Sequence, residues 1–114
     1  MPVACPTISP SVLASAGTQL TFRHSYDTEE VYDVGWLEIS IAGGDFTDIL
    51  EAGGHFVSGG YDTFGWWWSG DSGGFITTVV NLPEAAAGQS VQLRWCFSSD
   101  YSPAASVGMW IRSR

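Results

Sequence analysis

The chain contains no lysine and only four arginines against twelve aspartate and glutamate residues, so its net charge is −8. A nucleic-acid-binding protein needs a basic surface to meet the phosphates, and this sequence supplies none. The same balance disfavours binding to anionic membrane surfaces. No apolar run approaches the roughly 20 residues that a membrane-spanning helix requires. We therefore expect neither a nucleic-acid partner nor a membrane span.

Residues 1–20 also lack the basic start and the apolar stretch of a signal peptide. We interpret the 114 residues as one module that is cut from, or equivalent to, a piece of a larger protein. Residues 1–17 are expected to form an N-terminal strand or extension, and residues 18–111 the core.

Cysteine is nearly absent as well. Cys5 and Cys96 lie far apart and form no CxxC motif of the metal-binding or redox type. They are either two free thiols or a disulfide between an N-terminal strand and a late strand. A disulfide closing so long a loop would stabilise the fold by roughly 4–5 kcal/mol in the chain-entropy model. It would also indicate an oxidising, extracytoplasmic location.

Good helix formers other than alanine are sparse, and residues 85–87 allow at most one helical turn between Pro83 and Gly88. Fourteen glycines, six tryptophans, six phenylalanines and four tyrosines are present instead. Glycine serves turns, and aromatic side chains suit pleated, half-buried surfaces. The composition predicts an all-β domain with antiparallel strands and long loops.

Alternation of apolar and polar residues predicts strands over 18–26, 36–41 and 89–98. Further strands are expected over 75–82 and 107–111, with a short one over 46–50. The residues expected to face the core are Leu20, Phe22, His24, Tyr26, Leu37, Ile39, Ile41, Val91, Leu93, Trp95 and Phe97. The residues expected to face outward include Trp36, Glu38, Ser40, Gln92, Arg94 and Cys96. Residues 51–74 contain eight glycines and predict strand fragments joined by long loops.

An ordered set of short motifs carries a family resemblance over residues 18–111. The motifs include LTFRHSYDTE (20–29), YDVGWLEIS (32–40), WSGDSGGF (68–75), VVNL (79–82), AGQSVQLRW (87–95) and GMWI (108–111). Together they resemble the MAM-like jelly-roll modules of the cleaved-adhesin and choice-of-anchor-J type, which accompany secreted bacterial peptidases and surface proteins. Two positions depart from that pattern: Val34 stands where glycine is usual, and Arg112 where aspartate is frequent.

The resemblance implies a two-sheet β-sandwich with a jelly-roll path. It also implies a non-catalytic accessory module that often binds calcium and serves adhesion, carbohydrate binding or substrate targeting. Because Arg112 replaces the aspartate, a calcium-binding role at that position is lost.

An acidic loop over residues 27–34 is the candidate calcium site. Calcium takes six to eight oxygen ligands, and the candidate ligands are Asp27, Glu29, Glu30, Asp33 and, from a late loop, Asp100. The alternative is a solvated acidic turn, because no Asp-x-Asp-x-Asp-Gly motif is present. Zinc is disfavoured, since His24 and His55 lack a zinc-ligand spacing. We expect His24 in the core and His55 in an exposed loop.

Three consecutive tryptophans, Trp66, Trp67 and Trp68, are the most unusual feature. In an extended segment Trp66 and Trp68 would share one face and Trp67 the other, so one core cannot bury all three. Exposed flat rings stack on sugars and anchor protein interfaces. The predicted ligand-binding residues are Trp36, Tyr61, Phe64, Trp66 and Trp67. The alternative is that Trp68 caps the sandwich while one of its neighbours covers a loop.

The string Gly-Asp-Ser-Gly-Gly over residues 70–74 resembles the nucleophile motif of trypsin-like peptidases. A catalytic triad also needs a positioned base and an orienting acid, and the chain is about half the required length. We therefore interpret Ser72 as part of a turn and expect no enzyme activity.

These observations lead to one main hypothesis. The chain is a secreted or cell-surface module that binds a polysaccharide or another surface ligand through residues 61–68, with calcium rigidifying the acidic loop. A structural or interdomain module, with its tryptophans buried against a parent peptidase or adhesin, is the alternative. A small hydrolase is the third hypothesis. The ligand and the oligomeric state stay open.

Overall fold

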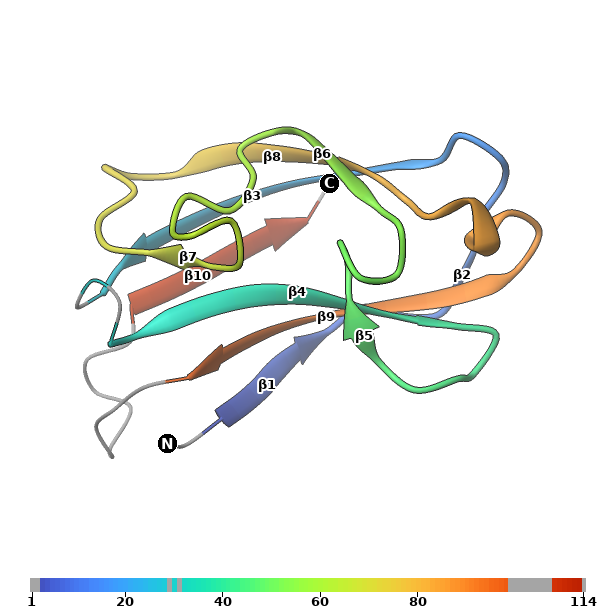
Figure 1. Cartoon of the computed structure of the whole chain (residues 1–114), viewed down its shortest axis with the longest axis horizontal. Helices are drawn as coiled ribbons and strands as arrows, with labels where there is room; N and C mark the ends of the chain where they lie inside the picture. The colour runs from blue at the N-terminus through green and yellow to red at the C-terminus, as the bar shows by residue number, and fades with distance from the viewer. Residues whose placement is uncertain (1–2, 29, 31, 99–107, 114) are drawn as a thin grey trace.

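The protein is built from two antiparallel β-sheets that pack face to face (Figure 1). The computed structural model describes residues 3–28, 30, 32–98 and 108–113. The first sheet has the order β1-β9-β4-β5, with β2 paired to β9 and β7 paired to β4. The second has the order β10-β3-β8-β6. The all-β, two-sheet fold predicted from the sequence is confirmed.

Five strands lie within two residues of the bounds predicted for them, 18–26, 36–41, 75–82, 89–98 and 107–111. The first sheet holds β1 (Val3–Ile8), β2 (Val12–Leu13), β4 (Val34–Ile41), β5 (Thr47–Asp48), β7 (Trp68–Ser69) and β9 (Ser90–Ser98). The second sheet holds β3 (Gln19–Asp27), β6 (His55–Ser58), β8 (Ile76–Asn81) and β10 (Gly108–Ser113). The part of the chain that the structure describes contains one short 3-10 turn, η1 (Glu84–Ala86), and no helix that could cross a membrane.

The core lies between the sheets and is rich in aromatic rings. Phe22 of β3 contacts Trp95 of β9 and Trp68 of β7 edge-on, with ring centroids 5.2 and 6.0 Å apart. Aliphatic side chains, Leu37 and Val80 among them, fill the remaining space. Edge-to-face pairs of this kind add about 0.5–1.5 kcal/mol each beyond the area they bury.

Two residues of β9 differ from the simple alternation of buried and exposed positions, and only the prediction for Phe97 is wrong. Cys96 points away from the core but is fully buried, because it is bonded to Cys5 and paired in register with Trp36. Phe97 is only half-buried, since its partner across the ladder is Gly35, which has no side chain to cover it. The disulfide thus closes over the outer face of the first sheet.

Two other expectations also need correction. The acidic loop is shorter than predicted, because Asp27 still belongs to β3 and Val34 already belongs to β4. Ser40 was expected to face solvent, but it is buried, and its hydroxyl donates a hydrogen bond to the carbonyl of Gly44 (2.6 Å) in the following turn.

Candidate ligand-binding site

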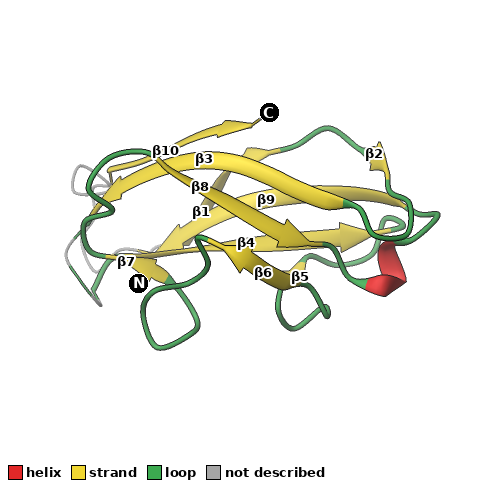
Figure 2. Cartoon of the chain, turned by 90° about the horizontal axis from the view of Figure 1, so that it is seen from above, coloured by secondary structure: helices red, strands yellow, loops and turns green. Residues whose placement is uncertain are grey.

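A gap in the edge of the first sheet creates the candidate site. Along the outer edge of β4, β7 pairs with Val34 and Gly35, and β5 pairs with Glu38 and Ile39. Between these two short strands the edge at Trp36 and Leu37 carries no strand. Seen from above, the loops next to β5 and β7 project side by side from this edge (Figure 2). They form the walls of a groove over the gap.

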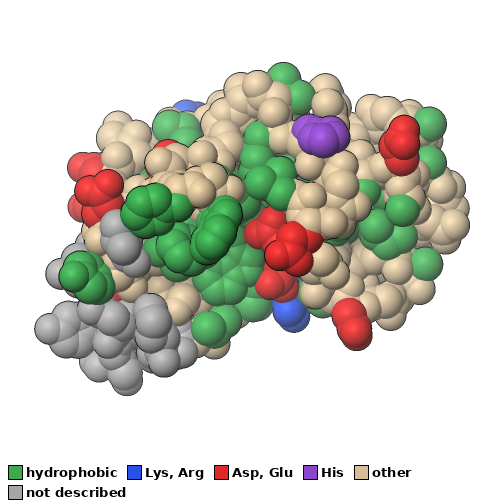
Figure 3. All heavy atoms as spheres, in the orientation of Figure 1, with side chains coloured by type: hydrophobic (Ala, Val, Ile, Leu, Met, Phe, Trp, Pro, Cys, Tyr) green, Lys and Arg blue, Asp and Glu red, His purple; other side chains and the backbone are tan. Residues whose placement is uncertain are grey.

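The groove has a volume of about 510 Å³. Its lining residues are Trp36, Asp48, Leu50, Glu51, Tyr61, Gly65, Trp66 and Trp67. Hydrophobic side chains gather over the middle of this face of the molecule, and carboxylates lie directly beside them (Figure 3). The site therefore combines aromatic surfaces with negative charge.

The hydroxyl of Tyr61 fills the gap in the ladder. It accepts a hydrogen bond from the Leu37 N–H (3.0 Å) and donates one to Asp48 Oδ2 (2.9 Å). Burial, reinforced by the charge of Asp48, raises the pKa of Tyr61 well above its ordinary value, although the Leu37 N–H opposes this shift. Tyr61 is therefore a neutral donor that fixes the position of the Asp48 carboxylate.

A tight turn presents the exposed tryptophan. Phe64 and Gly65 both have positive φ angles (55° and 74°), the pattern of the mirror-image turns that suit β-hairpins. The Thr63 carbonyl accepts from the N–H groups of both Trp66 (3.1 Å) and Trp67 (3.2 Å). The expectation that Trp66 and Trp68 share a face is wrong, because this turn replaces the extended backbone on which it rested.

Asp62 ties that turn to the body of the protein. Its Oδ1 accepts hydrogen bonds from the Ser69 N–H (3.0 Å) and the Thr63 hydroxyl (2.9 Å), and its Oδ2 accepts one from the Tyr26 hydroxyl. Burial, followed by the hydrogen bond to Asp62, raises the pKa of Tyr26 above its ordinary value. The loop thus has a rigid base.

Trp68, the third tryptophan of the run, is fully buried and packs edge-on against the groove residue Tyr61, with ring centroids 4.8 Å apart. Its indole N–H donates to the carbonyl of Gly59 (3.0 Å), which also accepts from the Thr78 hydroxyl (2.8 Å). Gly59 has a positive φ, and a Cβ atom there would lie 2.4 Å from the Thr77 carbonyl oxygen, so no other residue fits.

His24 belongs to the same buried network. Its Nε2 lies 2.8 Å from Thr78 Oγ1. The single hydrogen of that hydroxyl is given to Gly59, so Nε2 carries the imidazole proton. Burial lowers the pKa of His24 to about 4, against an opposing effect of Asp62. The prediction that His24 faces the core is confirmed. The prediction that His55 is exposed is confirmed as well, and His55 lies at the start of β6.

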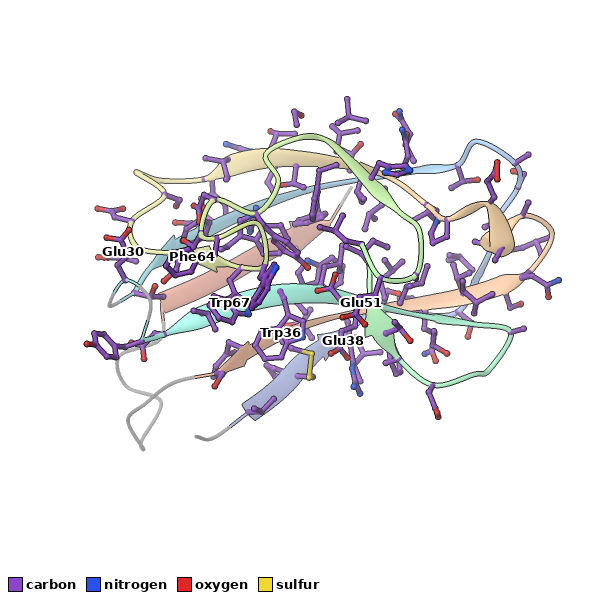
Figure 4. The ribbon with its side chains drawn as sticks, viewed as in Figure 1. Glu30, Trp36, Glu38, Glu51, Phe64 and Trp67 are labelled. Atoms are coloured by element: carbon purple, nitrogen blue, oxygen red, sulfur yellow. A yellow bond between two sulfur atoms is a disulfide. The ribbon has the colours of Figure 1, made fainter. Side chains whose placement is uncertain are left out.

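The structure brings together four of the five predicted ligand-binding residues, since Trp36, Tyr61, Trp66 and Trp67 all line the groove. Trp66 is 67% exposed, and its ring meets that of Trp67 at 90°. Phe64 does not line the groove; its ring contacts that of Trp67 edge-on, with centroids 6.4 Å apart. Figure 4 shows Phe64 and Trp67 on one side, with Glu51 toward β5.

The sequence analysis missed the two acidic residues of the groove, Asp48 and Glu51. Asp48 Oδ1 accepts from the Leu50 N–H (2.8 Å), which starts the turn that carries Glu51 to the rim. An aspartate two residues before such a turn is a readable local signal. Their position opposite the tryptophans depends on β5 and β7 sharing one edge of β4, and no local pattern indicates that.

Glu38 orients Trp36 beneath the groove. Its Oε2 accepts from the Trp36 indole N–H (2.8 Å), and its Oε1 pairs with Arg94 (2.7 Å). The Arg94 guanidinium also lies 4.1 Å from the centre of the Phe46 ring. Glu38 and Arg94 therefore neutralise each other, which leaves Asp48 and Glu51 to set the charge of the groove.

Among the residues that the structure describes, the predicted calcium ligands do not form a cluster. Asp27 and Glu30 are exposed and Asp33 is buried, while Glu29 and Asp100 lie outside the described ranges. Within those ranges one group of three potential metal ligands occurs, namely Cys5, Glu38 and Cys96. Its cysteines form the disulfide and its glutamate pairs with Arg94, so this group is no metal centre.

Ser72 holds a turn, as the sequence analysis interpreted it. Its hydroxyl oxygen accepts from the Tyr26 N–H (3.0 Å) and donates to the Gly74 carbonyl (2.6 Å).

Comparison with known proteins finds no relative, because no protein-family model, curated protein or solved structure matches the chain. The arguments about function therefore rest on the groove itself.

Proposed function

We propose that the protein is a non-catalytic module that binds a polysaccharide through the groove between β5 and β7. The observation that carries this proposal is the convergence of Trp36, Tyr61, Trp66 and Trp67 on one open groove. Sugar rings have apolar faces that stack on flat aromatic side chains, and hydroxyl groups that bond to carboxylates. A groove with both kinds of group, anchored on a sheet edge, suits an extended chain of sugars.

The strain at Phe64 supports the same proposal. A bulky residue with a positive φ is a rare and costly conformation, and such strain concentrates at functional sites. Phe64 is 72% exposed, so burial in the core does not explain it. Its ring contacts that of Trp67 edge-on, and Trp67 lines the groove.

A panel of soluble and insoluble polysaccharides, run with and without calcium, tests the proposal. Retardation in affinity gels should occur with at least one neutral or amino-bearing polysaccharide. In Trp67→Ala the affinity should fall by at least about tenfold, because a central aromatic anchor contributes that much. Tyr32→Ala is the matched control: Tyr32 is exposed and aromatic but does not line the groove. Equal retardation of both variants would remove the groove from the proposal.

Calcium binding by the acidic loop is proposed as a stabilising feature. The test is thermal melting with calcium and with chelator. A ligand that binds the native state raises its stability, so the midpoint should rise with calcium. Identical midpoints would remove calcium from the account.

The finer fold and the location belong to the same proposal. From β3 to β10 the chain passes repeatedly between the two sheets, which supports a jelly-roll path and the MAM-like resemblance. The Cys5–Cys96 disulfide supports a secreted or cell-surface location, because such bonds persist in oxidising compartments.

One observation favours the interdomain alternative. Apolar side chains are exposed along β1 and β2, at the opposite edge of the first sheet, and Leu13 is 77% exposed. The other members of this row are Val3, Ile8 and Val12. This edge, rather than the tryptophan groove, is the surface that a parent domain would cover.

A further inference from the structure

The charge of the groove narrows the class of glycan that it can take. Asp48 and Glu51 line the groove, and no arginine or histidine does among the residues that the structure describes. Asp48 belongs to β5, and Glu51 lies toward that strand (Figure 4). Trp66 and Trp67, which directly precede β7, also line the groove. A ligand lying in the groove therefore contacts indole rings and negative charge together.

The two carboxylates play different parts. Asp48 is fixed, because its oxygens accept from the Leu50 N–H and the Tyr61 hydroxyl. Glu51 is exposed and makes no hydrogen bond or ion pair with the described part of the chain. Asp48 thus supplies a preorganised charge, and Glu51 supplies a free acceptor at the rim.

The nearest described arginine does not cancel this charge. Arg94 is held by Glu38 at 2.7 Å and covers the Phe46 ring, so its charge is already matched. A cation is attracted by the faces of tryptophan rings as well as by carboxylates. An anion meets repulsion from Asp48, Glu51 and a net charge of −8.

We infer that the groove selects glycans that carry free amino groups, such as glucosamine oligomers, over neutral and acidic glycans. The inference rests on the proposed function and names its ligand class. In this arrangement the sugar faces stack on Trp66 and Trp67, and a protonated amino group lies between an indole face and the carboxylate of Glu51.

Three β-1,4-linked hexasaccharides that differ at carbon 2 provide the test. They are the glucosamine hexamer, its N-acetylated form and cellohexaose. Tryptophan emission is titrated with each at about pH 5.5, where the amino groups of the glucosamine hexamer are protonated. The glucosamine hexamer should bind about tenfold more tightly than cellohexaose, the size expected for a cation over an indole ring with an exposed ion pair.

Glu51→Gln should lower the affinity for the glucosamine hexamer far more than the affinity for cellohexaose, and should so abolish most of this preference. Glu84→Gln, which removes an exposed carboxylate outside the groove, should leave the preference intact. Spermidine, a cation with no sugar ring, should bind far more weakly than the glucosamine hexamer.

The outcomes separate the inference from the proposed function. Equal affinity for the three oligosaccharides overturns the inference and leaves glycan binding in place. If spermidine bound as tightly as the glucosamine hexamer, the groove would select a cation without any need for a sugar, and the inference that it selects amino-bearing glycans would be overturned. Failure of all three oligosaccharides, together with failure of the polysaccharide panel, overturns the proposed function itself.

Discussion

Phe64 occupies a backbone conformation that its own side chain disfavours. A left-handed conformation costs a non-glycine residue about 1–2 kcal/mol, and asparagine tolerates it better than phenylalanine does. The exposed ring gains little from burial in return. A substitution of Phe64 should therefore affect the free energy of unfolding and the affinity for polysaccharide in different directions.

We expect Phe64→Asn to keep or raise the free energy of unfolding, by up to about 1 kcal/mol. Affinity for the bound polysaccharide should fall, because Trp67 loses the ring that supports it. Urea unfolding and affinity gels measure the two effects. A variant that is less stable yet binds normally would show that Phe64 serves folding alone.

His24 makes stability depend on pH. Its pKa is about 4 in the folded protein and 6.5 in an unfolded chain. The unfolded state therefore binds more protons between these values, so stability falls as the pH drops from 6.5 toward 4. The difference corresponds to a loss of about 3 kcal/mol once the pH lies below both values.

Unfolding at pH 7 and at about pH 4.5 should show much of this loss in the wild type. In His24→Phe the part of the pH dependence that comes from imidazole should disappear, because phenylalanine does not titrate. An unchanged slope in His24→Phe would assign the acid sensitivity to other groups.

At the scale of elements, the loop over residues 61–67 depends on Asp62. Its carboxylate serves Tyr26, Thr63 and Ser69 at once. Asp62→Ala should lower the free energy of unfolding by about 1–3 kcal/mol, because it leaves these donors without their acceptor.

The same variant should also weaken the aromatic circular dichroism signal, since the turn that orders Trp66 and Trp67 is released. Asp45→Ala, at an exposed position in the loop between β4 and β5, is the control and should change neither quantity. If Asp62→Ala behaved like this control, the hydrogen bonds of Asp62 would not be what holds the loop.

The long strands were predictable because each lies between two different environments. In β3 the core side carries Phe22, His24 and Tyr26, and strict alternation follows from that asymmetry. Of the two short strands at the edge of β4, β5 falls within the strand predicted over 46–50, whereas β7 has no pattern of its own. They are held at the edge of β4 by hydrogen bonds of Asp48, Tyr61 and Asp62, and these contacts come from segments that meet only in the folded chain.

The candidate site was predictable in part for the same reason. A run of tryptophans in a glycine-rich segment indicates exposed rings; Trp66 fulfils that expectation, and Trp67 is half-buried. The choice of Trp68 as the buried member depends on its pairing with Gly35 and on the Gly59 carbonyl. The carboxylates of the groove depend on the positions of two loops, which the sequence does not encode locally.

For the whole molecule, the Cys5–Cys96 disulfide links an edge strand to a central one across 91 residues. Closing so long a loop should contribute about 4–5 kcal/mol to stability in the chain-entropy model. The double variant Cys5→Ala, Cys96→Ala should therefore melt at a much lower temperature. A matching melting temperature under reducing and oxidising conditions would contradict this contribution.

The central claim is that sugar binds over Trp36, Trp66 and Trp67, and the indole N–H signals of ¹⁵N-labelled protein test it most directly. Titration with the glucosamine hexamer and, separately, with cellohexaose should shift the signals of these three residues. The signals of Trp68 and Trp95, which are buried in the core, should stay in place. Shifts confined to other residues, or no shift with any polysaccharide that the protein retains, would contradict the account.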